Sequence, residues 1–131
     1  MLLVEDNEAD VLLIHEAIEA GNLAVTVHVV NDGEQAEAFF DRADNDASLR
    51  CPDLVILDIN LPKRNGGQVL SHLRRSRRCK DAVVLAVSTS DLPRDREQMA
   101  QLTANGYFKK PSDYHEFMKL GDVIRTLLQG K

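Results

Sequence analysis

Apolar residues along the chain gather into short runs that alternate with longer amphipathic segments. Continuous runs occupy residues 2–4, 54–57 and 82–87, and a shorter run lies at 107–108. Such runs are typical of strands that are buried on both faces of a parallel sheet. Residues 25–29 instead alternate between valine and polar side chains, which predicts a half-exposed strand at an edge of the sheet.

The segments between these strands carry the signals of helices. Apolar residues recur at helical spacing in four of them, namely Val11, Ile14 and Ile18, then Ala36, Phe39, Phe40 and Ala43, then Val69, Leu70 and Leu73, and finally Phe117, Leu120, Ile124 and Leu127. A further helix is predicted after Ser90 or Asp91, either of which can cap it, with Pro93 in its first turn. Ser112 is expected to cap a single last helix.

Five predicted strands therefore alternate with five predicted helices. Strict alternation of this kind predicts one parallel sheet that is covered by helices on both faces, with right-handed crossovers. A length of 131 residues suits one domain with a core of its own, and we see no linker or internal repeat. The pattern thus predicts a doubly wound α/β domain over residues 1–131.

Composition narrows the class of protein without identifying it. At 44% hydrophobic and 28% charged residues, the chain resembles an ordinary globular domain. The longest apolar run, about six residues at 82–87, is too short to cross a bilayer. No basic leader of a signal peptide precedes Glu5, so we expect a cytoplasmic location. The net charge of −5 argues against general nucleic-acid binding.

The two cysteines, Cys51 and Cys79, belong to no short-spaced metal or redox motif. We therefore expect them to stand alone as buried or half-buried apolar side chains. Unpaired cysteines of this kind suit a reducing cytosol.

Uncommon polar residues fall at the predicted carboxyl ends of the strands. Glu5 and Asp6 follow the first strand, Asp58 the third, Ser88 the fourth and Lys110 the fifth. Ligands of open α/β sheets bind at this edge, near the point where the strand order reverses. Each residue alone is also an ordinary turn, cap or solvated side chain, but those roles do not explain why each type ends its own strand.

The acidic residues at this edge favour a bound cation. Three carboxylates held together repel one another and raise one another's pKa values unless a cation shares the site. Mg²⁺ suits such a site, because it takes one or two carboxylates, keeps waters and accepts phosphate oxygens as further ligands. The sequence therefore predicts a Mg²⁺ site at Glu5, Asp6 and Asp58.

The chain resembles the receiver domain of bacterial two-component response regulators, the CheY-like family. The matching segments are LVEDN at 3–7, LDINLP at 57–62 with Gly66 following, VSTS at 87–90 and GYFKKP at 106–111. The likeness covers nearly the whole chain and implies a flavodoxin-like fold with strand order 2-1-3-4-5. In finer detail, LPKRNG and STS look most like the stand-alone receivers that serve phytochrome-type sensor kinases.

The resemblance implies a role for each polar residue at the edge. Asp58 would be the phosphoacceptor that attacks a phosphohistidine of a partner histidine kinase. Asp6 and Asp58 would ligate Mg²⁺ directly, the main-chain carbonyl of Asn60 would add a ligand, and Glu5 would act directly or through water. Lys110 would pair with Asp58 and then with the phosphoryl oxygens.

The resemblance also implies a switch. Ser88 would bond to the phosphoryl group, and Tyr107 would move into the space that Ser88 leaves. The bond between Lys110 and Pro111 would be cis, and Gly66 would allow a tight turn after the phosphoacceptor. No output region follows, so the signal would pass to a protein partner or a second copy through the face of the fourth helix, fifth strand and fifth helix. The only chemistry expected is self-catalysed phosphotransfer and autodephosphorylation.

Alternative interpretations remain at this stage. A receiver-like interaction domain that works without phosphorylation would usually lack one of the five polar residues. A Mg²⁺-dependent phosphatase would usually carry a second acid two residues after its nucleophile, where this chain has Asn60. The basic residues Arg74, Arg75, Arg77, Arg78 and Lys80 are expected to be solvated charges near a helix end, with a docking patch for an acidic partner as the alternative.

Overall fold

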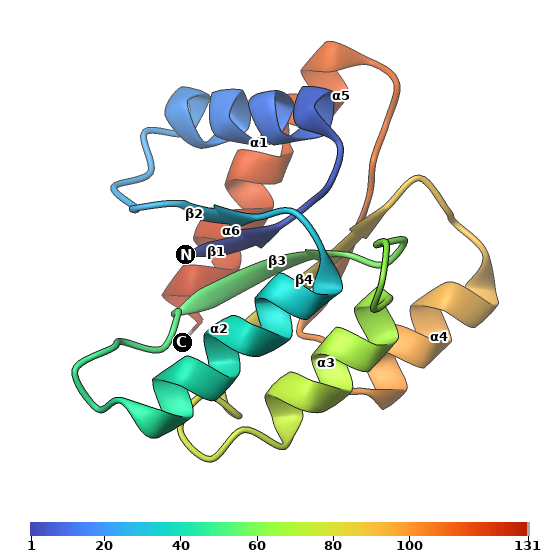
Figure 1. The fold of residues 1–131 in the computed structure, drawn as a ribbon. Helices are drawn as coiled ribbons and strands as arrows, with labels where there is room; N and C mark the ends of the chain where they lie inside the picture. The colour runs from blue at the N-terminus through green and yellow to red at the C-terminus, as the bar shows by residue number, and fades with distance from the viewer. Residues whose placement is uncertain (131) are drawn as a thin grey trace.

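A computed structural model describes residues 1–130 and contains one five-stranded parallel sheet between two layers of helices (Figure 1). The strands are β1 (Leu2–Val4), β2 (His28–Val30), β3 (Leu54–Asp58), β4 (Val83–Ser88) and β5 (Gly106–Lys109). Their order is β2-β1-β3-β4-β5, and every neighbouring pair is parallel. The predicted doubly wound sheet and its strand order are thereby confirmed.

The helices cover the sheet on both faces. They are α1 (Glu8–Ala20), α2 (Gly33–Asn45), α3 (Gly66–Arg74), α4 (Pro93–Gln101), α5 (Tyr114–Met118) and α6 (Leu120–Gln129). Helices α2, α3 and α4 pack on one face, and α1, α5 and α6 pack on the other (Figure 1).

The central strand β3 contributes to both cores, which explains its unbroken apolar run. Val55 and Leu57 belong to the core under α2, α3 and α4, whereas Leu54 and Ile56 belong to the core under α1, α5 and α6. Successive side chains of a strand point to opposite faces, so a strand between two cores must be apolar at every position. Both faces of β3 are therefore covered by helices, and neither face could meet solvent without exposing apolar side chains.

Two predicted boundaries differ from the structure. The last helix is divided at Lys119, whose backbone ends α5 and begins α6, and its amino-terminal cap is Asp113 rather than Ser112. Neither Ser90 nor Asp91 caps α4, because Leu92 occupies the capping position without a side-chain bond. Ser90 instead accepts from the backbone N–H of Leu92 at 3.2 Å and so closes the turn that precedes this helix.

The edge strand β2 is shorter than the predicted 25–29 and lies slightly later. Its pairing with β1 comprises only His28, Val29 and Val30, because β1 itself offers only Leu2–Val4 as partners. Val25 and Val27 lie outside the strand, but their side chains are half-buried against the neighbouring core. The edge position itself is confirmed.

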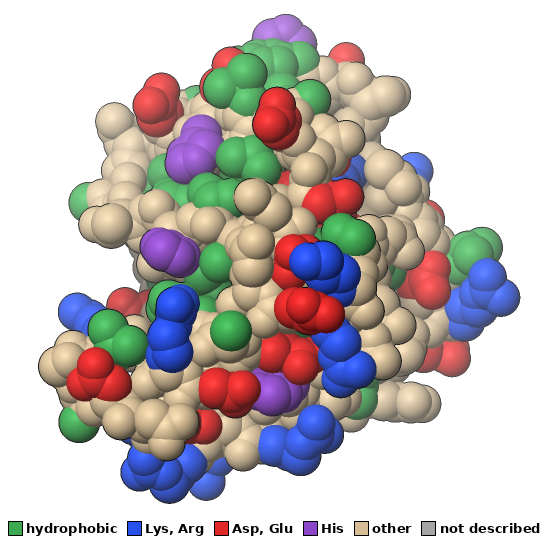
Figure 2. Space-filling model, in the orientation of Figure 1, with side chains coloured by type: hydrophobic (Ala, Val, Ile, Leu, Met, Phe, Trp, Pro, Cys, Tyr) green, Lys and Arg blue, Asp and Glu red, His purple; other side chains and the backbone are tan. Residues whose placement is uncertain are grey.

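Part of the basic cluster anchors loops, whereas Arg75, Arg77 and Lys80 are exposed, as expected of solvated charges. The Arg74 guanidinium donates to the carbonyl oxygens of Lys80, Ala82 and Thr103, each at 2.7 Å. The backbone N–H groups of Arg77 and Arg78 donate to the carboxylate of Asp44 near the end of α2. Figure 2 shows basic, acidic and histidine side chains interspersed over α2 and α3, with no large patch of one sign.

A disulfide joins Cys51 and Cys79, which contradicts the expectation that they stand alone. Cys51 lies in the loop before β3 and Cys79 in the loop before β4, with Cα atoms 5.3 Å apart. Their separation of 28 residues matches no short motif, and only the parallel arrangement of the two strands brings them together. The cysteines therefore do not support a reducing compartment.

Within residues 1–130, no helix is long and apolar enough to cross a membrane.

Breaking this disulfide is expected to lower the free energy of unfolding by about 3 to 4 kcal/mol, because the bond removes chain entropy from the unfolded state. Urea unfolding with and without a reducing agent measures the change. The Cys51→Ser/Cys79→Ser variant should unfold at the midpoint of the reduced protein in both conditions. An unchanged midpoint of the parent protein under reduction would mean that the cysteines are not joined.

Candidate functional site

The carboxyl ends of four strands bring the predicted polar residues to one edge of the sheet. Glu5 and Asp6 follow β1, Asp58 ends β3, Ser88 ends β4 and Lys110 follows β5. The register of the parallel pairs sets these side chains near one another, since the ends of β1, β3, β4 and β5 lie level. The grouping of these side chains therefore depends on the strand pairing and not on the conformation of any one loop.

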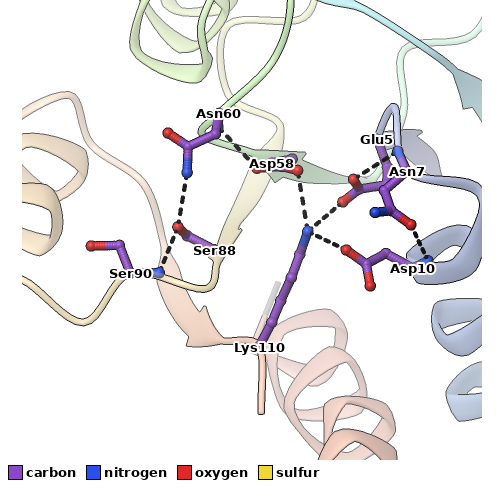
Figure 3. Close-up of polar contacts among 8 residues, drawn as sticks. All are labelled: Glu5, Asn7, Asp10, Asp58, Asn60, Ser88, Ser90 and Lys110. Atoms are coloured by element: carbon purple, nitrogen blue, oxygen red, sulfur yellow. Dashed lines mark hydrogen bonds and ion pairs between the residues drawn. The ribbon is translucent and has the colours of Figure 1, made fainter. Parts of the chain in front are cut away.

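Lys110 is the centre of the arrangement (Figure 3). Its side chain is 6% exposed, and its Nζ donates to Glu5 Oε2 at 2.8 Å, Asp10 Oδ2 at 2.9 Å and Asp58 Oδ2 at 3.1 Å. An ammonium group has three hydrogens, so these three carboxylates take all of them. The predicted contact between Lys110 and Asp58 is present. Residues 1–130 contain no cis peptide bond, so the bond to Pro111 is trans, contrary to the family pattern.

Asp10 was not predicted as a member of the site. It lies in the first turn of α1, where its backbone N–H donates to the side chain of the capping residue Asn7 at 3.0 Å. Acidic residues are common at this helix position because they favour the positive end of the helix dipole. The only signal in the sequence was its place four residues after Asp6, on a helix that begins at the same edge.

Burial shapes the charge of the site. Glu5 is fully buried, and burial together with the neighbouring Asp58 raises the pKa of Glu5 to about 7, against the opposing effect of Lys110. Burial by itself lowers the pKa of Lys110, but its contacts with Glu5, Asp58 and Asp10 outweigh burial and raise that pKa above its ordinary value. The ammonium therefore stays charged at neutral pH.

The acidic residues fit a hard divalent cation. Glu5, Asp6 and Asp58 each offer a carboxylate oxygen, and these oxygens lie within 4.8 Å of one another. Asp6 is exposed, whereas the other two are buried, so the group opens to solvent on one side. Asn60 lies beside it and donates its backbone N–H to Asp58 Oδ1 at 2.9 Å. An all-oxygen donor set of this kind suits Mg²⁺ or Mn²⁺.

Ser88 connects the group of polar residues around Lys110, which we call the pocket, to the loop between β4 and α4. Its side chain is fully buried, and its Oγ accepts from Asn60 Nδ2 at 3.3 Å and from the backbone N–H of Ser90 at 3.0 Å. Both bonds use the oxygen as acceptor, so the hydroxyl proton is committed to neither of them.

Tyr107 lies outside the pocket but is bonded to the same loop. Its hydroxyl donates to the carbonyl oxygen of Ser90 at 2.8 Å, and the guanidinium of Arg96 lies 4.5 Å from its ring centre. Ser90 thus contacts Ser88 through its N–H and Tyr107 through its carbonyl. One residue therefore joins the two predicted switch residues.

Two ion pairs hold the loop after Asp58 against α2 and its capping residue Asp32. Arg64 pairs with Glu37 of α2 at 2.9 Å, and Lys63 pairs with Asp32 at 3.5 Å.

Gly66 closes the same loop through a close approach rather than an unusual backbone conformation. A Cβ at this position would lie 2.5 Å from the Cα of Ile59, and the φ angle of Gly66 is not positive. The sequence predicted a turn that needs the backbone freedom of glycine. The structure shows instead that glycine is required because the backbone of Ile59 packs against it. Any side chain here would push the backbone that follows Asp58.

Comparisons with known proteins agree with this geometry. Residues 1–121 match the model of the response regulator receiver domain. The chain is 29% identical to the response regulator Rcp1 of Synechocystis sp., over 96% of this chain and 86% of that protein. The crystal structure of the phosphorylated cyanobacterial phytochrome response regulator RcpA superposes with a TM-score of 0.85 and 32% identity, over 98% of this chain and 91% of that one. The Mn²⁺-bound form of Rcp1 gives 0.83 and 29%, over 95% and 90%.

Proposed function

Since the chain belongs to the response regulator receiver family of two-component systems, we propose that it accepts a phosphoryl group on Asp58 from a histidine kinase in a Mg²⁺-dependent reaction. The observation that carries the proposal is the buried Lys110 ammonium, which contacts Asp58 beside the acidic group of Glu5, Asp6 and Asp58. A buried acceptor carboxylate next to a fixed positive charge and a cation site is what phosphoryl transfer requires.

Asp58 is the nucleophile of the proposed reaction. A carboxylate oxygen of Asp58 forms the new bond to phosphorus as the phosphorus–nitrogen bond of the donor phosphohistidine breaks and the imidazole leaves. An ionised carboxylate needs no general base. Its orientation is held by the N–H of Asn60 on one oxygen and by Lys110 on the other.

Charge at the pocket supports the transfer. Glu5, Asp6 and Asp58, with the main-chain carbonyl of Asn60, would hold Mg²⁺, which supplies positive charge to the phosphoryl oxygens when bound. Lys110 supplies further positive charge from its place against Asp58.

The response is proposed to run through Ser88 and Tyr107. The Ser88 hydroxyl proton, which neither of its present bonds uses, donates to a phosphoryl oxygen, and movement of Ser88 toward that oxygen pulls on its bonds with Asn60 and Ser90. Because the carbonyl of Ser90 accepts from Tyr107, movement of Ser90 with Ser88 would loosen the bond that holds the aromatic side chain. The face of α4, β5 and the last helix, which is divided into α5 and α6, would then change shape and meet a protein partner or a second copy of the chain.

The donor is proposed to be a phytochrome-type sensor kinase, because the similar RcpA is a phytochrome response regulator. The proposed chemistry consists of phosphotransfer to Asp58 and the later loss of that phosphoryl group by the chain itself. We propose no reaction on other substrates.

Incubation with acetyl phosphate and Mg²⁺ tests the proposal. We expect the mass gain of one phosphoryl group, which hydroxylamine should remove because an acyl phosphate reacts with it. Backbone amide shifts should change at residues 88–92 and across β5. No mass gain would favour an interaction domain that works without phosphorylation, and steady hydrolysis of phosphate esters without a mass gain would favour a phosphatase. Either outcome overturns the proposal.

A further inference from the structure

The Lys110 ammonium has a partner that the proposed reaction does not use. Of its three carboxylates, Asp58 is the proposed acceptor and Glu5 belongs to the acidic group that fits a cation. Asp10 belongs to neither role, yet it lies as close to Nζ, at 2.9 Å, as Glu5 does at 2.8 Å. Its side chain is 23% exposed, so this carboxylate borders the solvent side of the pocket.

The position of Asp10 is set by α1 rather than by Lys110. Asn7 caps the helix by accepting from the N–H of Asp10, which fixes Asp10 in the first turn. In Figure 3 the Asp10 side chain extends from the start of this helix toward the lysine, on the side opposite Asn60 and Ser88. The carboxylate is therefore held in place before any phosphoryl group arrives.

Saturation of the ammonium has a consequence for phosphorylation. Each of the three Nζ hydrogens already has a carboxylate acceptor, so a bond from Lys110 to a phosphoryl oxygen must replace one of them. Three carboxylates, those of Glu5, Asp10 and Asp58, share this one ammonium, and the exposed carboxylate of Asp6 lies beside Glu5 and Asp58. Because Asp10 lies 2.9 Å from the Nζ that would bond to the phosphoryl group, its negative charge would repel the incoming phosphoryl oxygens.

We propose that Asp10 is a positioning residue that holds Lys110 in the unphosphorylated state and thereby limits how tightly the site retains a phosphoryl group. This inference rests on the proposed function. Asp10 acts through Lys110 and by its charge, and it does not itself contact the reacting atoms. The Asp10 carboxylate thus shifts the equilibrium between the unphosphorylated and the phosphorylated site toward the unphosphorylated one.

Beryllofluoride, which stands in for a phosphoryl group on a carboxylate, tests this role at saturating Mg²⁺. Asp10→Asn keeps the shape of the side chain and removes its charge, so we expect the apparent affinity for beryllofluoride to rise about tenfold, the size of effect of one nearby like charge. Asp10→Glu keeps the charge and should stay near the parent protein. Amide shifts give the affinity in each case.

Glu8→Gln is the matched control, since Glu8 is an exposed acid in the same first turn of α1. It removes the same charge from the helix and should leave the beryllofluoride affinity unchanged. The ¹⁵N signal of Lys110 Nζ, recorded without Mg²⁺, should move in Asp10→Asn but not in Glu8→Gln. This second measurement reports on the position of the lysine independently of phosphorylation.

The outcomes separate this inference from the proposed function. Equal or weaker beryllofluoride binding by Asp10→Asn, with normal binding by the parent protein, would overturn the role of Asp10 and leave the proposed function intact. An equal gain in Glu8→Gln would reduce the effect to general helix charge and would also overturn it. Failure of the parent protein to bind beryllofluoride would overturn both.

Discussion

Asp58→Asn is expected to abolish the mass gain with acetyl phosphate and Mg²⁺. An amide cannot serve as the attacking carboxylate, so no acyl phosphate can form. The fold should survive, because the amide oxygen can still accept from the N–H of Asn60. The amide NH₂ would then face the Lys110 ammonium in place of an acceptor, and we expect a local rearrangement of that lysine. Intact-protein mass spectrometry measures the result.

Asp81→Asn provides the control, since Asp81 is exposed and lies before β4, at the opposite end of the strands from the pocket. This variant should be modified as fully as the parent protein. If Asp58→Asn still gained a hydroxylamine-sensitive phosphoryl group, the acceptor would be another carboxylate, with the exposed Asp6 as the next to test.

Lys110→Met is expected to have the second-largest effect, on both the reaction and the fold. Methionine fills a similar volume but leaves Glu5, Asp10 and Asp58 without their cation. Removal of one partner from a buried ion pair costs about 3 to 5 kcal/mol of unfolding free energy, and protonation of Glu5 places this case near the lower end. Phosphorylation by acetyl phosphate should slow by about 10²- to 10³-fold, as when one fixed donor is lost from a charged transition state.

Urea unfolding and the rate of mass gain measure these two effects. Lys109→Met is the neighbouring control, because Lys109 is exposed at the end of β5, and its replacement should change stability by no more than about 0.5 kcal/mol. Added Mg²⁺ should recover part of the stability of Lys110→Met, since a cation replaces the lost positive charge. Stability and rate equal to the parent protein would mean that Lys110 has no role in the pocket.

The sheet and most of the pocket could be predicted from the sequence, because their signals are periodic and local. Apolar runs identified the strands, and parallel strands must bring Asp58 and Lys110 to the same edge although 52 residues separate them. The order of the strands came from resemblance to a family rather than from the pattern itself.

The features that sequence reasoning missed depend on contacts between distant segments. Asp10 reads as an ordinary acid in a first helical turn, and only the folded sheet brings Lys110 to it. Arg74 reads as a solvated charge because its backbone acceptors become available only when two loops converge beside it. The apolar stripe of the last helix runs through the break at Lys119, so periodicity could not reveal it.

The bond between Tyr107 and Ser90 gives the chain a built-in optical probe. The sequence contains no tryptophan and only two tyrosines, Tyr107 on β5 and Tyr114 at the start of α5. Tyrosine emission therefore originates from β5 and the start of α5. The ring of Tyr107 lies against Arg96, and its hydroxyl is bonded to the loop between β4 and α4. The tyrosine emission spectrum of the unlabelled protein should consequently report in real time whether the bond between Tyr107 and Ser90 is present.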